Sequence, residues 1–185
     1  MIEIKGLTKY YGSLAALTDL NLSIDAGEIF GFIGPNGAGK TTTMRILATL
    51  MEPTRGTASI NGVDVLRNGK GVRRLVGYMP DFMGVYDDLK VFEYLEFFAA
   101  AFNIERSKRK TVVEGVLELT DLGGKRAATV DSLSRGMQQR LGLARVLIHD
   151  PMVLILDEPP AAWTRGRASR CASCCASSRA WARPS

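Results

Sequence analysis

A glycine-rich loop at residues 34–41 constrains the fold of this chain more than any other part of its sequence. The loop reads Gly-Pro-Asn-Gly-Ala-Gly-Lys-Thr and fits the pattern G-x-x-x-x-G-K-[ST]. The apolar run Glu28–Ile33 comes directly before it and predicts a strand buried on both faces. Apolar residues at helical spacing follow from Lys40 to Met51, and Pro53 ends that pattern. The sequence therefore predicts a strand, a phosphate-binding loop and a helix in succession.

The residue types of this loop suit a phosphate group. Glycines let backbone N–H groups turn toward phosphate oxygens, and the helix N-terminus adds its partial positive charge. Lys40 would reach the β and γ phosphates, and the Thr41 hydroxyl would bind Mg²⁺. The agreement of motif and context favours this interpretation over a glycine turn with an incidental lysine. The candidate nucleotide-binding residues are Gly34, Pro35, Asn36, Gly37, Ala38, Gly39, Lys40, Thr41 and Thr42.

Two further motifs carry related chemistry. An apolar strand predicted at Met152–Leu156 ends in Asp157 and Glu158, which would lie at the edge of a parallel sheet. Asp157 would hold hydrated Mg²⁺, and Glu158 would take a proton from the attacking water. Ser134 and Gly136 form a Ser-x-Gly turn that opens a helix, a second anion-binding N-terminus. One nucleotide does not need two such termini, which suggests that the second serves a nucleotide held by another copy.

The remaining pattern predicts an α/β fold with an N-terminal antiparallel sheet and a helical insertion at about residues 85–135. Alternating apolar residues near both Ile2 and Leu22 indicate half-buried strands, and Asn61-Gly62 indicates a tight turn. A short strand is expected at Val76–Met79. Helices are expected over an aromatic stripe at 91–102, from a Ser107 cap to Leu119, and at 134–148.

In these motifs the chain resembles the nucleotide-binding subunit of ATP-binding cassette (ABC) transporters. GPNGAGKTT, LSRGMQQRL and VLILDEP occur in the family's order, and the resemblance covers residues 1–159. It implies a P-loop NTPase core that hydrolyses ATP with Mg²⁺, with Lys40 and Glu158 as catalytic residues. It also implies that Tyr11 in KYYG stacks on adenine, although Tyr10 or Tyr11 could instead pack on the sheet. Ser134 and Gly136 would contact the γ phosphate of the nucleotide bound by the partner.

The resemblance also implies partners and a location. Two nucleotide-binding subunits, identical or different, would sandwich two ATP molecules and dock on transmembrane permease subunits at the inner face of the cell membrane. Two departures stand out: GYMPD places Asp81 where the family usually has glutamine, and the signature reads LSRGM rather than LSGGQ. Asp81 could still meet Mg²⁺ or position water. The cargo and the direction of transport are not encoded in these motifs.

Composition divides the chain near residue 160. Five of the 24 basic residues and none of the 19 acidic residues lie in 160–185, so the first 159 residues hold 19 of each and the net charge of +5 belongs to the tail. That neutrality argues against nucleic-acid binding. The tail holds all three cysteines and both tryptophans but no Leu, Ile, Val, Met or Phe. No apolar run is long enough to cross a bilayer, and no secretory signal is evident, so a cytoplasmic protein is expected.

The neighbouring reading frame accounts for this tail. In that frame, each codon combines the third base of one codon with the first two bases of the next. The pair Trp163-Thr164 then encodes aspartate, Cys174-Cys175 encodes leucine and Trp181-Ala182 encodes glycine, whichever synonymous codons are used. With GC-rich codons the tail reads LDPRARIEVRELLRELARMGKTI, which supplies the Leu-Asp-Pro loop and the charged helix of the family. We therefore interpret 1–161 as an incomplete nucleotide-binding domain and 162–185 as an out-of-frame, disordered product of one lost base. A genuine basic tail is the alternative.

The sequence is compatible with three functions. The first is an ATPase subunit that powers a transporter. The second is a truncated, non-hydrolysing nucleotide-binding remnant. The resemblance implies a segment after Glu158 with a histidine that contacts the γ phosphate, and residues 159–185 contain no histidine. The third is a soluble ATPase of the same type that takes no part in transport. The only histidine, His149, is expected at a surface helix end.

Overall fold

The computed structural model describes residues 1–81, 84 and 88–157. Two compact units divide the chain, with the boundary between Val76 and Gly77. The first unit contains β1 (Ile2–Tyr11), β2 (Leu14–Ile24), α1 (Lys40–Leu47), β3 (Arg55–Ile60), β4 (Val63–Asp64) and α2 (Gly69–Leu75). The second contains nearly all of β5 (Val76–Met79), then α3 (Val91–Ala101), α4 (Arg106–Leu119), the short 3₁₀ helix η1 (Gly123–Lys125), α5 (Arg135–Leu147) and β6 (Val153–Leu156).

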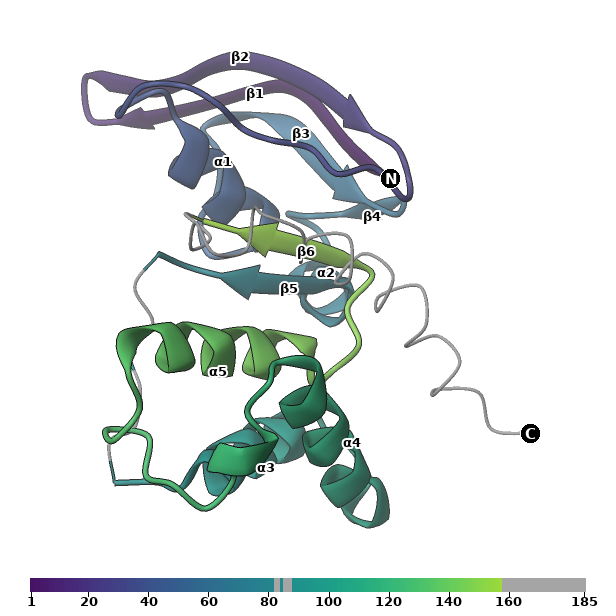
Figure 1. The fold of residues 1–185 in the computed structure, drawn as a ribbon. Coiled ribbons are helices and arrows are strands. Elements are labelled where there is room, and N and C mark those ends of the chain that lie inside the picture. The colour runs from purple at the N-terminus through teal and green to yellow at the C-terminus, as the bar shows by residue number, and fades with distance from the viewer. Residues whose placement is uncertain (82–83, 85–87, 158–185) are drawn as a thin grey trace. The chain divides into compact units, whose positions relative to one another are not determined.

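An antiparallel sheet in the order β2-β1-β3-β4 forms the first unit (Figure 1). Ile2 pairs with Ile24 and Ile4 pairs with Leu22, so the alternating apolar pattern does place β1 against β2. The turn between β3 and β4 is made by Asn61 and Gly62, both at positive φ. Such turns suit the twist of paired strands, and both the N-terminal sheet and this turn are confirmed.

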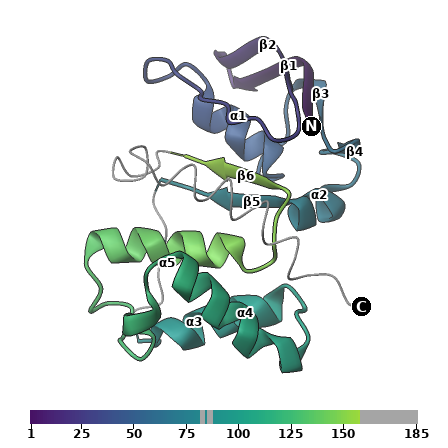
Figure 2. The same ribbon diagram turned by 45° about the vertical axis from the view of Figure 1, so that its right-hand side comes forward.

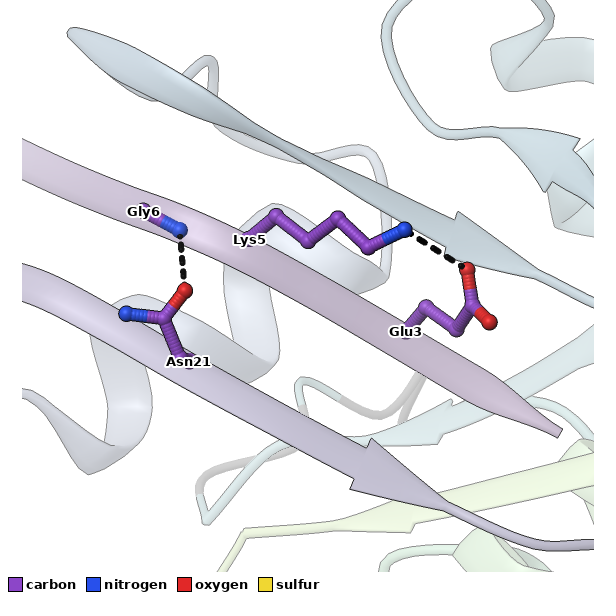
Figure 3. A network of polar contacts seen from close by, with 4 residues as sticks. All are labelled: Glu3, Lys5, Gly6 and Asn21. Carbon is purple, nitrogen blue, oxygen red and sulfur yellow. Dashed lines mark hydrogen bonds and ion pairs between the residues drawn. The ribbon is translucent and has the colours of Figure 1, made fainter.

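A side chain completes the hydrogen bonding where β1 is irregular. The pairing of β1 with β2 shifts register between Ile4 and Leu7, and Gly6 lies in that gap with φ of 59°. Its N–H donates to Asn21 Oδ1 at 2.8 Å (Figure 3). In the same figure Lys5 lies along the strand with its ammonium 3.6 Å from the Glu3 carboxylate. Asn21 thus supplies the acceptor that the irregular ladder does not, which keeps the strand continuous.

Helix α1 packs through Ile46, Leu47 and Ala48, all of them buried. It is shorter than the sequence predicted, because it ends at Leu47 rather than near Met51. Thr49 takes a positive φ of 61°, a conformation that cannot continue a right-handed helix. Pro53 therefore lies beyond the point at which the helix has already ended.

The strand expected at Glu28–Ile33 is absent from the described structure, and that prediction was wrong. The segment has no regular secondary structure, and Ile29 and Ile33 are 76% and 97% exposed. A strand needs a neighbour to complete its hydrogen bonds, and the described sheet of the first unit consists of β1 to β4 alone. The apolar run has strand character but no partner here.

The second unit pairs β5 with β6 and covers them with α5 (Figures 1 and 2). Leu143 and Val146 of α5 pack with Met79 at the end of β5. Helices α3, α4 and α5 bury a larger apolar cluster, whose fully buried members include Tyr94, Leu95, Leu122, Val130 and Leu141. None of the helices in the described ranges combines the length and the apolarity that crossing a bilayer requires.

Helix starts were predicted with mixed success. Helix α5 begins at the Ser-x-Gly turn, as expected, and Ser134 is its N-cap residue, whose hydroxyl accepts a hydrogen bond from the Met137 N–H at 3.4 Å. Helix α4 instead has Glu105 at its N-cap position, and Ser107 lies within its first turn. His149 is not a simple surface residue. It is half-buried, and its ring stacks on Phe102 at 4.0 Å with an interplanar angle of 6°.

Candidate nucleotide-binding site

The glycine-rich loop of the first unit is open to solvent and runs directly into α1. Residues 34–38 are exposed, and Gly39 is the N-cap residue of the helix with φ of 80°. Because Gly39 has no side chain, the N-terminus of α1 receives no side-chain cap from it. A helix N-terminus of this kind, flanked by exposed backbone, can take an anion.

Lys40 folds back over the loop that precedes it. Its ammonium donates to the carbonyl oxygens of Gly34 at 2.6 Å and Pro35 at 2.8 Å. The cation is therefore held at the same loop that would cradle phosphate. Thr41 and Thr42 follow on the first turn of α1, and both are half-buried.

The backbone of the loop is fixed against β2 at Gly39. A Cβ atom there would lie 2.6 Å from the Ala16 carbonyl oxygen and 3.1 Å from the Leu17 side chain. Gly37 also has a positive φ, 84°, but a Cβ there would meet nothing within 4 Å. The Ala16 carbonyl thus limits how closely the loop approaches the sheet. No local sequence pattern predicts this contact.

Tyr11 ends β1 and keeps 46% of its surface exposed. Its hydroxyl donates to the Met51 sulfur at 3.0 Å, and the Lys9 ammonium lies 5.6 Å from the centre of its ring. Tyr10 is similarly exposed, at 42%. Neither tyrosine is buried in the sheet, so the Tyr11 ring remains accessible to a planar partner.

The second unit places two of the predicted carboxylates just beyond paired strand ends. The Asp157 N–H donates to the Met79 carbonyl oxygen at 2.9 Å, and β5 and β6 run in the same direction (Figure 1). Asp157 is 7% exposed, whereas Asp81, two residues beyond Met79, is exposed. The carboxyl edge of a parallel pair is where α/β proteins bind ligands. Glu158 lies outside the described residues.

Ser134, Arg135 and Gly136 form the exposed start of α5. A Cβ atom at Gly136 would meet nothing within 4 Å, so open space lies in front of this residue. Gln138 donates from its backbone to the Ser134 carbonyl at 2.9 Å, and its side chain donates to the Val130 carbonyl at 3.4 Å. These bonds hold the Ser-x-Gly turn in place and leave its outer face accessible.

Curated relatives cover the same part of the chain. The family model described as ABC transporter matches residues 17–161. The chain is 41% identical over 159 residues to the Bacitracin transport ATP-binding protein BcrA of Bacillus licheniformis, covering 86% of this chain and 51% of that protein. It is 40% identical over 158 residues to Nod factor export ATP-binding protein I of Burkholderia orbicola (strain AU 1054), covering 85% and 52%. The chain thus spans about half the length of these two relatives.

Solved structures agree with the sequence comparisons. The model superimposes on an ATP-binding subunit of an ABC transporter with a TM-score of 0.82 and 28% identity, covering 95% of this chain and 75% of the other. It also matches MJ0796, a dimeric ATP-binding cassette in a post-hydrolysis state bound to ADP and Pi, with a TM-score of 0.77 and 26% identity over 88% of this chain and 75% of that one. The fold is that of a P-loop ATPase cassette, as predicted, and the chain belongs to the ABC transporter family.

Proposed function

We propose that this chain binds MgATP and hydrolyses it as the ATP-binding subunit of an ABC transporter. The observation that carries the proposal is the solvent-open segment 34–38 of the loop, with the Lys40 ammonium held 2.6 Å from the Gly34 carbonyl. An exposed loop, a glycine-capped helix and a local cation together form an anion site. The relatives named as transport ATP-binding proteins support the transporter context.

Each site residue receives a proposed role. Lys40 would exchange its carbonyl partners for the β and γ phosphates, and Tyr11 would stack on adenine through its exposed ring. Glu158 would accept a proton from the water that attacks the γ phosphorus, which leaves ADP and inorganic phosphate. Ser134 and Gly136 would contact the nucleotide bound by a second subunit. The remaining loop residues would donate backbone N–H groups to the phosphates.

Magnesium suits the oxygen donors that the sequence supplies. A hydroxyl at Thr41 and a carboxylate at Asp157 are hard oxygen ligands of the kind that Mg²⁺ prefers. The low exposure of Asp157, 7%, supports a role other than a solvated surface charge. Bound Mg²⁺ would neutralise charge that develops on the phosphate oxygens. Asp81 would position water or contact the metal through water.

The proposed assembly needs other chains. A second nucleotide-binding subunit, identical or different, would complete each site, and transmembrane permease subunits would hold the pair at the inner face of the membrane. The dimeric structure of MJ0796 supports the first of these partners. A soluble ATPase of the same type is the alternative, and membrane fractionation of cells expressing the permease genes distinguishes the two.

Residues 162–185 raise a second candidate, a nucleotide-binding remnant that does not hydrolyse ATP. The family match ends at residue 161, where the composition changes, and this supports the interpretation of the tail as an out-of-frame product. Resequencing the DNA from codon 155 tests it. An additional base, followed by an open frame, would restore the transport ATPase. If the base is absent, the product is a truncated cassette, and its turnover decides whether it is a remnant.

ATP turnover tests the main proposal. Affinity for a fluorescent ATP analogue and release of inorganic phosphate are measured on the wild-type chain and on Glu158→Gln. Binding with turnover that the substitution abolishes supports hydrolysis by this site. Binding without turnover supports the remnant. Turnover that survives Glu158→Gln would overturn the assignment of Glu158 as the base. Glu28→Gln, a carboxylate outside the motifs, is the matched control.

A further inference from the structure

The charged side chains at both ends of helix α4 have the sign that the helix dipole disfavours. Its first five residues include the cations Arg106, Lys108, Arg109 and Lys110, and its first turn contains no acidic residue. Its second half contains Glu114 and Glu118, and its last turn contains no basic residue. Cations are unfavourable at a helix N-terminus and anions at a C-terminus. Glu114 is compensated by an ion pair with Arg126 at 3.7 Å, whereas the helix dipole disfavours the cations at the N-terminus.

Two of the four cations make a local contact with an oxygen acceptor. Lys108 lies 3.4 Å from the Glu105 carboxylate, and the Arg109 Nε donates to the Ile104 carbonyl at 2.8 Å. Hydrogen bonds from Ser107 and then Lys108 lower the pKa of Glu105, so its charge offsets one cation. Arg106 and Lys110 are exposed, and no ion pair within the described ranges involves either of them. Residues 105–110 keep a net charge of +3.

Exposed aromatic rings lie in the preceding helix and in the connection to α4. Phe102 follows the last residue of α3, four positions before Arg106, and is 39% exposed. One face of its ring stacks on His149. Phe97, on α3, is 52% exposed. Figure 2 shows α3 and α4 side by side in the second unit. A cluster of four cations next to exposed apolar rings is typical of surfaces that bind anionic lipid headgroups.

We propose that the start of α4, together with Phe102, binds the surface of an anionic lipid bilayer. The four cations occupy five residues, about 7.5 Å of helix, and the carboxylates of Glu114 and Glu118 follow on the same helix. Nucleic acid binding requires cations spread over many phosphates, which this short cluster does not provide. Arg106 and Lys110 are four residues apart on the helix and therefore share one face, on which they can contact neighbouring headgroups. This surface acts independently of ATP hydrolysis and needs no permease subunit.

Vesicle binding by the full chain tests the proposal. The probes are vesicles of phosphatidylcholine alone and of phosphatidylcholine mixed with phosphatidylglycerol, in cosedimentation at low salt. We expect binding to the anionic vesicles only, and Arg106→Gln/Lys110→Gln to weaken it by about fivefold for each cation removed. The control Lys70→Gln/Arg74→Gln removes the same charge from two exposed positions of α2 and should change binding much less.

The arginines of residues 160–185 could also bind anionic lipid, so the comparison is repeated with all five changed to glutamine. Persistence of the difference between the α4 variant and the α2 control in that background supports the proposal. Loss of all vesicle binding on changing the five arginines overturns it, as does equal weakening by the α4 and α2 variants. Folding is checked by thermal unfolding, where removal of N-terminal cations should leave the midpoint unchanged or higher. Unchanged ATP turnover in the α4 variant separates this result from the proposed hydrolysis.

Discussion

The ammonium of Lys40 lies 2.6 Å from the carbonyl oxygen of Gly34, the first residue of its own loop. The Pro35 carbonyl, at 2.8 Å, is its second partner. Both acceptors are neutral, so a phosphate that enters the loop offers the same cation a charged and therefore stronger partner. Under the proposed function, Lys40 would exchange these two carbonyl oxygens for phosphate oxygens of the nucleotide.

Replacement of Lys40 by alanine should weaken ATP binding at least tenfold. A hydrogen bond to a charged group contributes about 1.5–3 kcal/mol, and the variant loses that contact with phosphate. The free energy of unfolding should change by less than about 1 kcal/mol, because the lysine is only half-buried and its partners face solvent. Titration with a fluorescent ATP analogue measures the affinity. Lys70→Ala, at an exposed lysine of α2, is the control, and equal affinities of the two variants would contradict the phosphate-binding role.

Gly39→Ala should destabilise the first unit more than Gly37→Ala. Gly37 has a φ of 84° and Gly39 a φ of 80°. Alanine is strained in this left-handed region, so the substitution should lower the free energy of unfolding by about 1–2 kcal/mol at either position. At Gly39 the new methyl group also meets the Ala16 carbonyl at 2.6 Å, and overpacking of this kind adds about 1–3 kcal/mol. Urea denaturation of both variants gives the two free energies. A Gly37→Ala loss as large as the Gly39→Ala loss would show that the contact with β2 is unimportant.

Local patterns predicted the elements whose neighbours are close in sequence. Alternation in β1 and β2, the Asn61-Gly62 turn and the start of α5 at the Ser134 turn all rest on interactions within a few residues or across one hairpin. Val76–Met79 forms β5 with the predicted bounds. The expected strand at Glu28–Ile33 failed for the opposite reason. A strand depends on a neighbour that its own residues do not encode, and no described strand pairs with it.

The site was predictable as motifs but not as contacts. The sequence located the loop 34–41, Asp157 and the Ser134 turn, because residue types and spacing identify them. It did not reveal that Ala16 limits the approach of Gly39, or that Asp157 hydrogen bonds to Met79. Those contacts join residues more than twenty positions apart and depend on how the strands pack.

Gly77→Ala should be among the more damaging substitutions in the second unit. A Cβ atom at Gly77 would lie 2.5 Å from the Val146 side chain, 2.9 Å from Pro151 and 3.0 Å from Leu154. These neighbours pack β5 between α5 and β6, so a loss of about 1–3 kcal/mol is expected on overpacking. Gly124→Ala is the matched control, since a Cβ there would meet nothing within 4 Å, and its effect should stay within about 0.5 kcal/mol. Thermal unfolding of the pair measures the difference.

Ser107→Ala should raise the pKa of Glu105 toward its usual value. The hydrogen bond from Ser107 is the largest cause of the lowered pKa of this carboxyl, followed by the bond and the charge of Lys108. Carboxyl NMR titration of the two proteins measures the shift. Because the folded-state pKa is lower than the unfolded one, the contribution of Glu105 to stability is present above the unfolded-state pKa and is lost as pH falls through the folded-state value.

The hydrogen bond between Ser107 and Glu105 explains why the sequence analysis wrongly placed the start of α4 at Ser107. Serine is a favoured N-cap residue, but here its hydroxyl donates a hydrogen bond to the side chain of Glu105, and Glu105 occupies the N-cap position. Lys108→Gln provides the comparison, because it leaves the Ser107 bond intact and removes the positive charge of Lys108. We expect the pKa of Glu105 to rise more in Ser107→Ala than in Lys108→Gln. The reverse order would mean that charge attraction, rather than the hydroxyl bond, holds this carboxylate at the start of α4.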